Sequence, residues 1–173
     1  YYIPGTSIVV RPTFSIKYSQ NNYLMKDVEV WSEEEDRYIL TNKRRFHDDY
    51  FSLFGQIEAG VNGKKWADLF FVGVSYDKVD KDIQTGAMQN KVYGDASRNS
   101  NSFNIYARYA KKWGAVSTRL NFSHTWEESE TIDTTFRKYS WDGTWMPSSG
   151  NEINNGRKSI RVYKRPQTVI NPR

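Results

Sequence analysis

Cysteine is absent from the 173-residue chain, so neither a disulfide framework nor a thiolate metal site is available. Long apolar runs are absent too, and no stretch approaches the ~20 residues that a membrane-spanning helix needs. No segment keeps an apolar period near 3.6 over several turns, which argues against a helical fold. Residues 1–5 lack the basic and apolar character of a signal peptide, so we expect an exported form to be a mature or internal segment.

Patterns that carry catalysis or bind metals are also scarce. The run His47-Asp48-Asp49 is better interpreted as a polar cluster at a strand end, because neighbours on a strand point to opposite faces. Asp77, Asp80 and Asp82 lack the further oxygen ligands and the glycine of a calcium loop, and a solvated acidic loop is favoured. We find no Ser/His/Asp arrangement and no phosphate-binding glycine loop. We therefore predict no enzyme activity, no metal and no cofactor.

The net charge of +5 raises the possibility of nucleic-acid binding. Its best support is two short basic clusters, at residues 43–45 and 111–112. Each cluster lies beside an expected turn or strand end, and the glycine-aromatic signature of an RNA-binding sheet is missing. We predict no nucleic-acid partner.

What the chain does have is apolar residues at every second position. Between residues 6 and 19 the apolar side chains fall on even positions and the polar ones on odd positions. The apolar members are Ile8, Val10, Phe14, Ile16 and Tyr18. Residues 115–126 repeat the pattern with Val116, Leu120, Phe122 and Trp126 on one face. A period of two predicts β-strands with one apolar and one polar face.

The whole chain reads as one all-β domain, residues 1–173, built as an antiparallel up-and-down meander of about six strands. The expected strands are about 6–19, 50–60, 66–76, 102–110, 115–126 and 159–170. Asn62-Gly63 predicts a two-residue hairpin, and a second short turn is expected at 111–114. The other connections are long and polar. Short and long connections thus alternate along the chain.

In an up-and-down sheet, this alternation puts the short turns at one end and the long loops at the other. Outer-membrane β-barrels have such an asymmetry, and aromatic residues at the strand ends suit their two interfacial girdles. We therefore expect part of a transmembrane barrel, with Val116, Leu120 and Phe122 facing lipid. Arg119, Asn121 and Ser123 should then face the lumen, and Asn99 and Asn151 should be exposed external loop tips. A soluble β-rich binding module, with glycans as its ligands, is the alternative.

Three segments resemble the C-terminal barrel of a TonB-dependent outer-membrane receptor: residues 48–55 (DDYFSLFG), 66–76 and 131–143 (TIDTTFRKYSWDG). The resemblance implies a transporter that imports a nutrient across the Gram-negative outer membrane. Its partners would be outer-membrane lipid, the nutrient and a TonB-type energy-coupling protein. The chain shows no energy-coupling box, plug domain or terminal aromatic residue, and six strands are too few for a family that uses about 22. We therefore expect a fragment of a longer barrel.

A candidate ligand-binding group lies in the last long connection. Tyr139, Trp141 and Trp145 could stack on a sugar or peptide, and Asp142 could accept hydrogen bonds from hydroxyl groups. The alternative interpretation is structural: the tryptophans pack as a local cap or hairpin with Asp142-Gly143 as its turn. The sequence favours the structural interpretation without excluding binding.

Overall fold

The computed structural model describes residue 3 and residues 7–32, 34–86, 89, 91–153 and 159–172. Position 6, where the first strand was predicted to begin, lies outside these residues. The strands are β1 Ile8–Gln20, β2 Leu24–Ser32, β3 Arg37–Arg44, β4 Asp49–Asn62, β5 Leu69–Asp82, β6 Ser97–Trp113, β7 Val116–Asp133, β8 Arg137–Tyr139, β9 Trp145–Pro147 and β10 Ser159–Pro172. No helix in the described part of the chain is long and apolar enough to cross a membrane.

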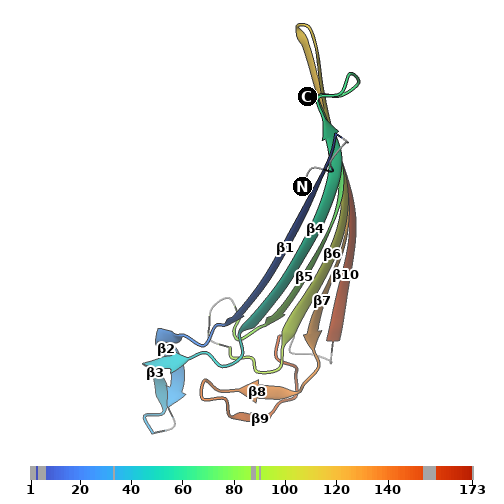
Figure 1. Ribbon diagram of the computed structural model, residues 1–173. Coiled ribbons are helices and arrows are strands. Elements are labelled where there is room, and N and C mark those ends of the chain that lie inside the picture. The colour runs from blue at the N-terminus through green and yellow to red at the C-terminus, as the bar shows by residue number, and fades with distance from the viewer. Residues whose placement is uncertain are drawn as a thin grey trace.

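Six strands form one antiparallel sheet in the order β1-β4-β5-β6-β7-β10. The all-β class and the six-stranded meander are therefore confirmed. Figure 1 shows this sheet as a single curved layer, with the two short turns at one end and the small hairpins β2–β3 and β8–β9 at the other. Strands β1 and β10 are its edges, and Pro12 stands on edge strand β1, where a missing N–H is tolerated.

Three strands run further toward the long connections than predicted. β5 continues to Asp82, β6 begins at Ser97, and β7 continues to Asp133. Their added segments consist mainly of Ser, Asn, Asp and Glu and carry no apolar alternation, so periodicity could not detect them. They pair with one another nonetheless, as in the register of Asn99 with both Asp80 and Glu130. Asn99 is therefore a strand residue and not a loop tip.

The turn after β4 is longer than the predicted two-residue hairpin. Asn62 pairs with Leu69, and residues 63–68 form the connection, with Gly63 at φ 63°. Ala67 is fully buried there, and the backbone N–H of Asp68 donates to the carbonyl of Ala110 at 2.9 Å. The turn between β6 and β7 does hold only two residues, 114 and 115, with Gly114 at φ 58°.

Most apolar side chains of the sheet share one face. Their register places Ile8 in a row with Val61, Phe70, Tyr109 and Leu120 of the next four strands. Many of these side chains are open to the surroundings: Phe14 is 68% exposed, Ile16 57% and Ile57 50%. Exposed apolar side chains therefore line one face of the sheet.

The apolar band is inclined to the strands. It covers residues 8–18 on β1, 51–61 on β4, 69–76 on β5, 103–113 on β6 and 116–126 on β7, and Trp66 continues it onto the turn before β5. Tyr18 shares a row with Glu130 of β7, yet the band on β7 already ends at Trp126, four residues earlier. Four residues span about 13 Å along a strand, and four strand spacings span about 19 Å. Averaged over the five strands the band is thus inclined by about 35°, and the whole shift falls between Phe51 of β4 and Tyr76 of β5.

The opposite face is polar and centres on Glu58, which is 5% exposed. Arg11 Nη1 donates to Glu58 Oε1 at 3.2 Å, and Tyr106 Oη donates to Oε2 at 3.1 Å, where Arg108 also binds. Both guanidinium groups lie over the ring of buried Phe71, at 4.7 and 5.6 Å from its centre. One carboxylate thus ties together β1, β4 and β6, with an aromatic ring of β5 beneath them.

Two glycines of β4 provide a matched test of this packing. A Cβ on Gly60 would lie 2.1 Å from the carbonyl oxygen of Phe70 and 2.6 Å from the Phe71 ring, whereas one on Gly55 meets only Phe14, at 4.0 Å. We expect Gly60→Ala to lower the free energy of unfolding by about 3 kcal/mol through overpacking and Gly55→Ala to leave it nearly unchanged. Chemical denaturation of the refolded protein measures both, and equal effects would contradict the described register.

Candidate functional site

The predicted ligand residues lie on the hairpin β8–β9 at the long-connection end. Tyr139 and Trp145 stand directly opposite each other across this hairpin. Between them, Asp142 Oδ1 accepts from the backbone N of Thr144 at 3.0 Å and from its hydroxyl at 2.7 Å, and Gly143 has φ 84°. These hydrogen bonds, first that from the hydroxyl, lower the pKa of the Asp142 carboxyl. The predicted Asp142-Gly143 turn is therefore present, as the structural interpretation expected.

Trp141 does not share a surface with the other two rings. It is 4% exposed and packs with Met25 and Val28 of β2, beside the half-buried Val30 and Val92. Its Nε1 has no hydrogen-bond partner in the described part of the chain. Trp141 thus packs the connection between β7 and β10 against hairpin β2–β3. That hairpin lies inside a stretch predicted only as a long polar loop, although Val28 and Val30 alternate with Glu29 and Trp31 there.

Trp145, by contrast, is 51% exposed and has a cation beside it. The Arg137 guanidinium lies 4.2 Å from the Trp145 ring centre and donates to Asp95 at 3.2 Å. Tyr139 Oη donates to the same Asp95 carboxylate at 2.8 Å, and burial raises the pKa of this phenol. The group open to a ligand is therefore Trp145, Arg137 and the Tyr139–Asp95 pair. Arg137 and Asp95 were not predicted, because only the fold brings the second and third long connections together.

Gly94 allows the second and third long connections to approach each other closely. A Cβ at this position would lie 2.4 Å from Cε1 of Tyr139, so only glycine allows the ring to cover the backbone. Glu152 then holds the same segment, because its carboxylate accepts from the N–H groups of Gly94 at 2.8 Å and Asp95 at 3.1 Å. Burial raises the pKa of the Glu152 carboxyl, and this effect exceeds the opposing effect of the hydrogen bonds from Gly94 and Asp95.

Asp133, at the end of β7, fixes the segment that carries Glu152. Its carboxylate accepts from the backbone N–H groups of Glu152 and Ile153, each at 3.0 Å, and its carbonyl accepts from Asn151 at 3.1 Å. Asn151 is consequently 3% exposed, so the prediction of an exposed loop tip at this position is wrong. A loop side chain that satisfies buried backbone groups is structural and cannot be replaced freely.

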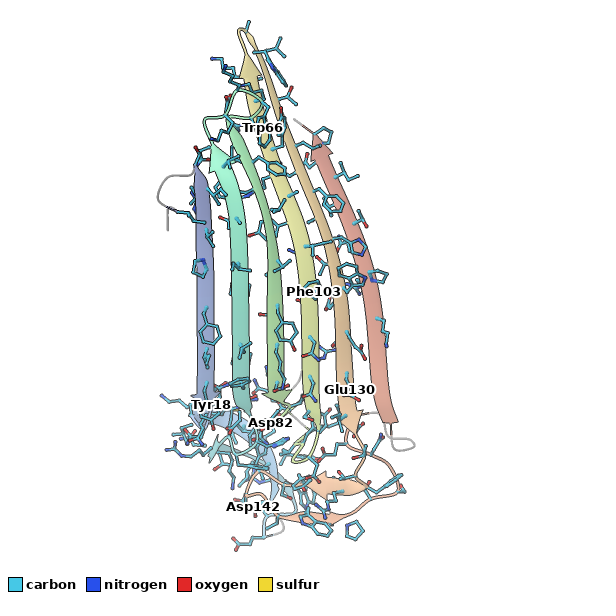
Figure 2. All side chains as sticks on the ribbon, turned by 45° about the vertical axis from the view of Figure 1, so that its right-hand side comes forward. Tyr18, Trp66, Asp82, Phe103, Glu130 and Asp142 are labelled. Carbon is cyan, nitrogen blue, oxygen red and sulfur yellow. The ribbon has the colours of Figure 1, made fainter. Side chains whose placement is uncertain are left out.

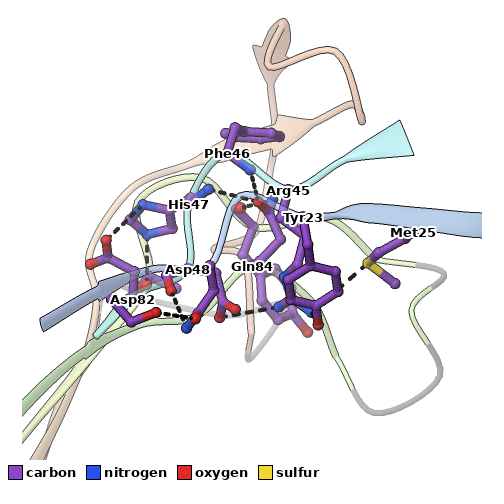
Figure 3. A network of polar contacts seen from close by, with 12 residues as sticks. Tyr23, Met25, Arg45, Phe46, His47, Asp48, Asp82 and Gln84 are labelled. Carbon is purple, nitrogen blue, oxygen red and sulfur yellow. Dashed lines mark hydrogen bonds and ion pairs between the residues drawn. The ribbon is translucent and has the colours of Figure 1, made fainter. Parts of the chain in front are cut away.

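A second network joins the first and second long connections, as Figure 3 shows. Gln84 is fully buried, and its Oε1 accepts from the backbone N–H groups of Phe46 at 2.6 Å and His47 at 2.7 Å. Its Nε2 donates to the carbonyl of Tyr93 at 3.0 Å. His47 Nε2 lies 2.9 Å from the carbonyl oxygen of Ala96. One amide side chain thus satisfies three backbone groups from two connections.

The acidic residues considered as metal ligands do not converge. Asp48 pairs with Arg45 at 3.1 Å, Asp49 accepts from Tyr18 at 2.9 Å, and His47 faces Asp82 at 3.6 Å. Asp77 and Asp80 lie three apart on β5 and therefore point to opposite faces of the sheet. Among the described residues, no group of three or more His, Cys, Asp or Glu side chains is placed to hold a metal ion.

Comparisons with known proteins give no relative: no family model matches the chain, and neither the curated proteins nor the solved structures contain a match. Ligand binding by Tyr139, Trp141, Asp142 and Trp145 therefore stays a prediction, as does the resemblance to TonB-dependent receptors.

The two tryptophans of this connection should behave differently when truncated. We expect Trp141→Ala to destabilise the loop layer by about 3 kcal/mol, because a buried ring is lost from its cluster. Trp145→Ala should leave stability within about 0.5 kcal/mol, because half of the ring is exposed. Hydrogen exchange of hairpin β2–β3 measures both effects. Rapid exchange in the Trp145 variant alone would contradict this assignment.

Proposed function

We propose that this chain forms wall strands and external loops of an outer-membrane β-barrel transporter of the TonB-dependent receptor type. The observation that carries the proposal is the inclined apolar band on one face of a six-stranded meander. Eleven residues extend about 36 Å along a strand, and an inclination of about 35° reduces this to about 30 Å. That height is close to the thickness of the hydrocarbon core of a bilayer and to the apolar band of such barrels.

The polar face and the open edges support the same proposal. Glu58, Arg11 and Arg108 would lie on the lumenal side, where polar groups are usual in large barrels. Strands β1 and β10 are the two edge strands of this sheet. Backbone groups in lipid require partners, so further strands would have to complete the barrel. A plug and a contact to a TonB-type energy-coupling protein would likewise be supplied outside these 173 residues.

The long connections would face the outside of the cell and first meet the nutrient. Their best candidate contact is Trp145 with Arg137, since an exposed indole beside a guanidinium can take a planar or polyhydroxylated ligand. The class of nutrient stays open. The proposed role is transport without catalysis.

A spin-label scan of β7 tests which face meets lipid. The chain has no cysteine, so each variant at Leu120, Asn121, Phe122 or Ser123 carries one label. In phospholipid vesicles we expect labels at 120 and 122 to be relaxed mainly by oxygen and labels at 121 and 123 mainly by a water-soluble nickel complex. The reason is the period-two alternation of the strand. Equal accessibility at all four positions in a water-soluble product would favour the soluble glycan-binding module.

Orientation is tested with epitope tags on intact Gram-negative cells. A tag in the exposed β2–β3 turn at Asp36 should bind antibody directly, and tags at Gly63 or Gly114 should become accessible only after the outer membrane is breached. All three positions lie in turns at positive φ, so they are matched in local structure. Surface labelling at Gly63 but not at Asp36 would reverse the proposed orientation.

A further inference from the structure

The hydrogen bonds of hairpin β8–β9 determine which backbone groups of β9 point outward. Opposite residues of an antiparallel pair alternate between hydrogen-bonded pairs and pairs without mutual hydrogen bonds. The two ends of the hairpin are closed by hydrogen bonds from the N–H of Ser140 to the carbonyl of Thr144 at 2.9 Å and from the N–H of Ser148 to the carbonyl of Phe136 at 3.1 Å. Counted from either end, Trp145 and Pro147 belong to pairs without mutual hydrogen bonds. The N–H and C=O of Trp145 and the C=O of Pro147 therefore point away from β8.

The β8 side of this hairpin is already occupied, whereas the β9 side is open. Tyr139 of β8 forms an antiparallel bridge with Val92 of the second long connection, and Val92 forms another with Thr85. These segments make a small ladder that ends at β9, whose only strand neighbour in the described part of the chain is β8. Figure 1 shows β9 on the outer side of the hairpin, with β8 toward the sheet. Figure 2 shows Asp142, in the turn of the hairpin, at the opposite end of the molecule from Trp66.

Both faces of the open edge carry apolar side chains. Trp145 is 51% exposed and Met146 is 56% exposed, and successive residues of a strand point to opposite faces. Pro147 is exposed as well, and a proline is tolerated at an edge where its missing N–H would face solvent. An added strand would meet an indole on one face, a thioether on the other and backbone groups between them. A carbohydrate could stack on the indole but would not match this alternation.

We propose that the outer edge of β9 binds an extended peptide, which joins the ladder as an antiparallel strand. The peptide residue opposite Trp145 would exchange two backbone hydrogen bonds with it, and the residue opposite Pro147 would donate a third to the Pro147 carbonyl. The side chain opposite Trp145 would contact the indole, because directly opposed residues share a face. This inference rests on the proposed function, because it names an extended peptide as the class of nutrient.

Fluorine NMR of protein labelled with 5-fluorotryptophan, held in lauryldimethylamine-oxide micelles, tests the site without insertion into a bilayer. The probe is acetyl-Ser-Val-Tyr-Val-Ser-amide. We expect it to shift the Trp145 resonance, which Trp145→Phe assigns, while the resonance of buried Trp141 reports that the loop layer is folded. Methylation of the tyrosine nitrogen should weaken binding about tenfold relative to methylation of the next valine nitrogen. The reason is that only the tyrosine N–H would face the edge.

Pro147→Ala tests the same geometry in the opposite direction. It supplies an outward N–H beside the bound peptide, so we expect binding to tighten about fivefold. The matched control is Pro12→Ala on edge strand β1 of the sheet, which should leave the affinity unchanged. Pro147→Ser supplies the same N–H and replaces the alanine variant if that variant loses the Trp141 resonance.

Equal affinity for the two methylated peptides would show recognition by side chains alone and overturn the proposal. Tighter binding of maltoheptaose than of the peptide would assign the edge to a glycan, and a Trp145 shift with protein concentration alone would assign it to a second copy; either result overturns the proposal. Absence of peptide binding while the Trp141 resonance reports a folded loop layer refutes the peptide site alone. The proposed function fails separately in the spin-label scan, and peptide binding by such a protein would identify a soluble peptide-binding module.

Discussion

The register of backbone hydrogen bonds across the six-stranded sheet is the constraint on which the other features depend. Because side chains alternate along each strand, a shift of one residue between any two strands would move a whole apolar set to the polar face. Five successive antiparallel pairings keep the apolar residues of all strands together. The inclined band and the Glu58 cluster both exist only in this register.

The side chains on the two faces of the sheet differ in the partners that they require. On the apolar face, exposed aliphatic and aromatic side chains need no polar partner, and small residues simply leave space. On the polar face, Glu58 is buried and requires the donors that surround it, because an unpaired buried carboxylate is strongly unfavourable. Gly60 and Gly73 then let the rings of Phe71 and Tyr106 lie flat on neighbouring strands. Polar groups and close packing therefore concentrate on the face opposite the band.

The long strands of the sheet could be predicted where their apolar residues alternate, whereas their polar ends and the short hairpin β2–β3 were not predicted. Residues 8–18 and 116–126 show their period directly, whereas the ends of β5, β6 and β7 are polar on both faces and are recognisable only by their pairing. The candidate ligand group, likewise, could be predicted only in part. Tyr139 and Trp145 stand out as aromatic residues, but Asp95 joins them only because Gly94 lets two distant connections touch.

The polar extensions of the strands have a mechanical consequence. β7 continues for seven residues beyond Trp126, which is about 23 Å along the strand, and it stays paired with β6 as far as Ile132. In the proposed barrel this segment would form a stiff collar above the headgroups, so the loops would start from a rigid rim and not from the lipid surface. The exposed Trp145 would then be presented from a rim whose position is fixed by the sheet.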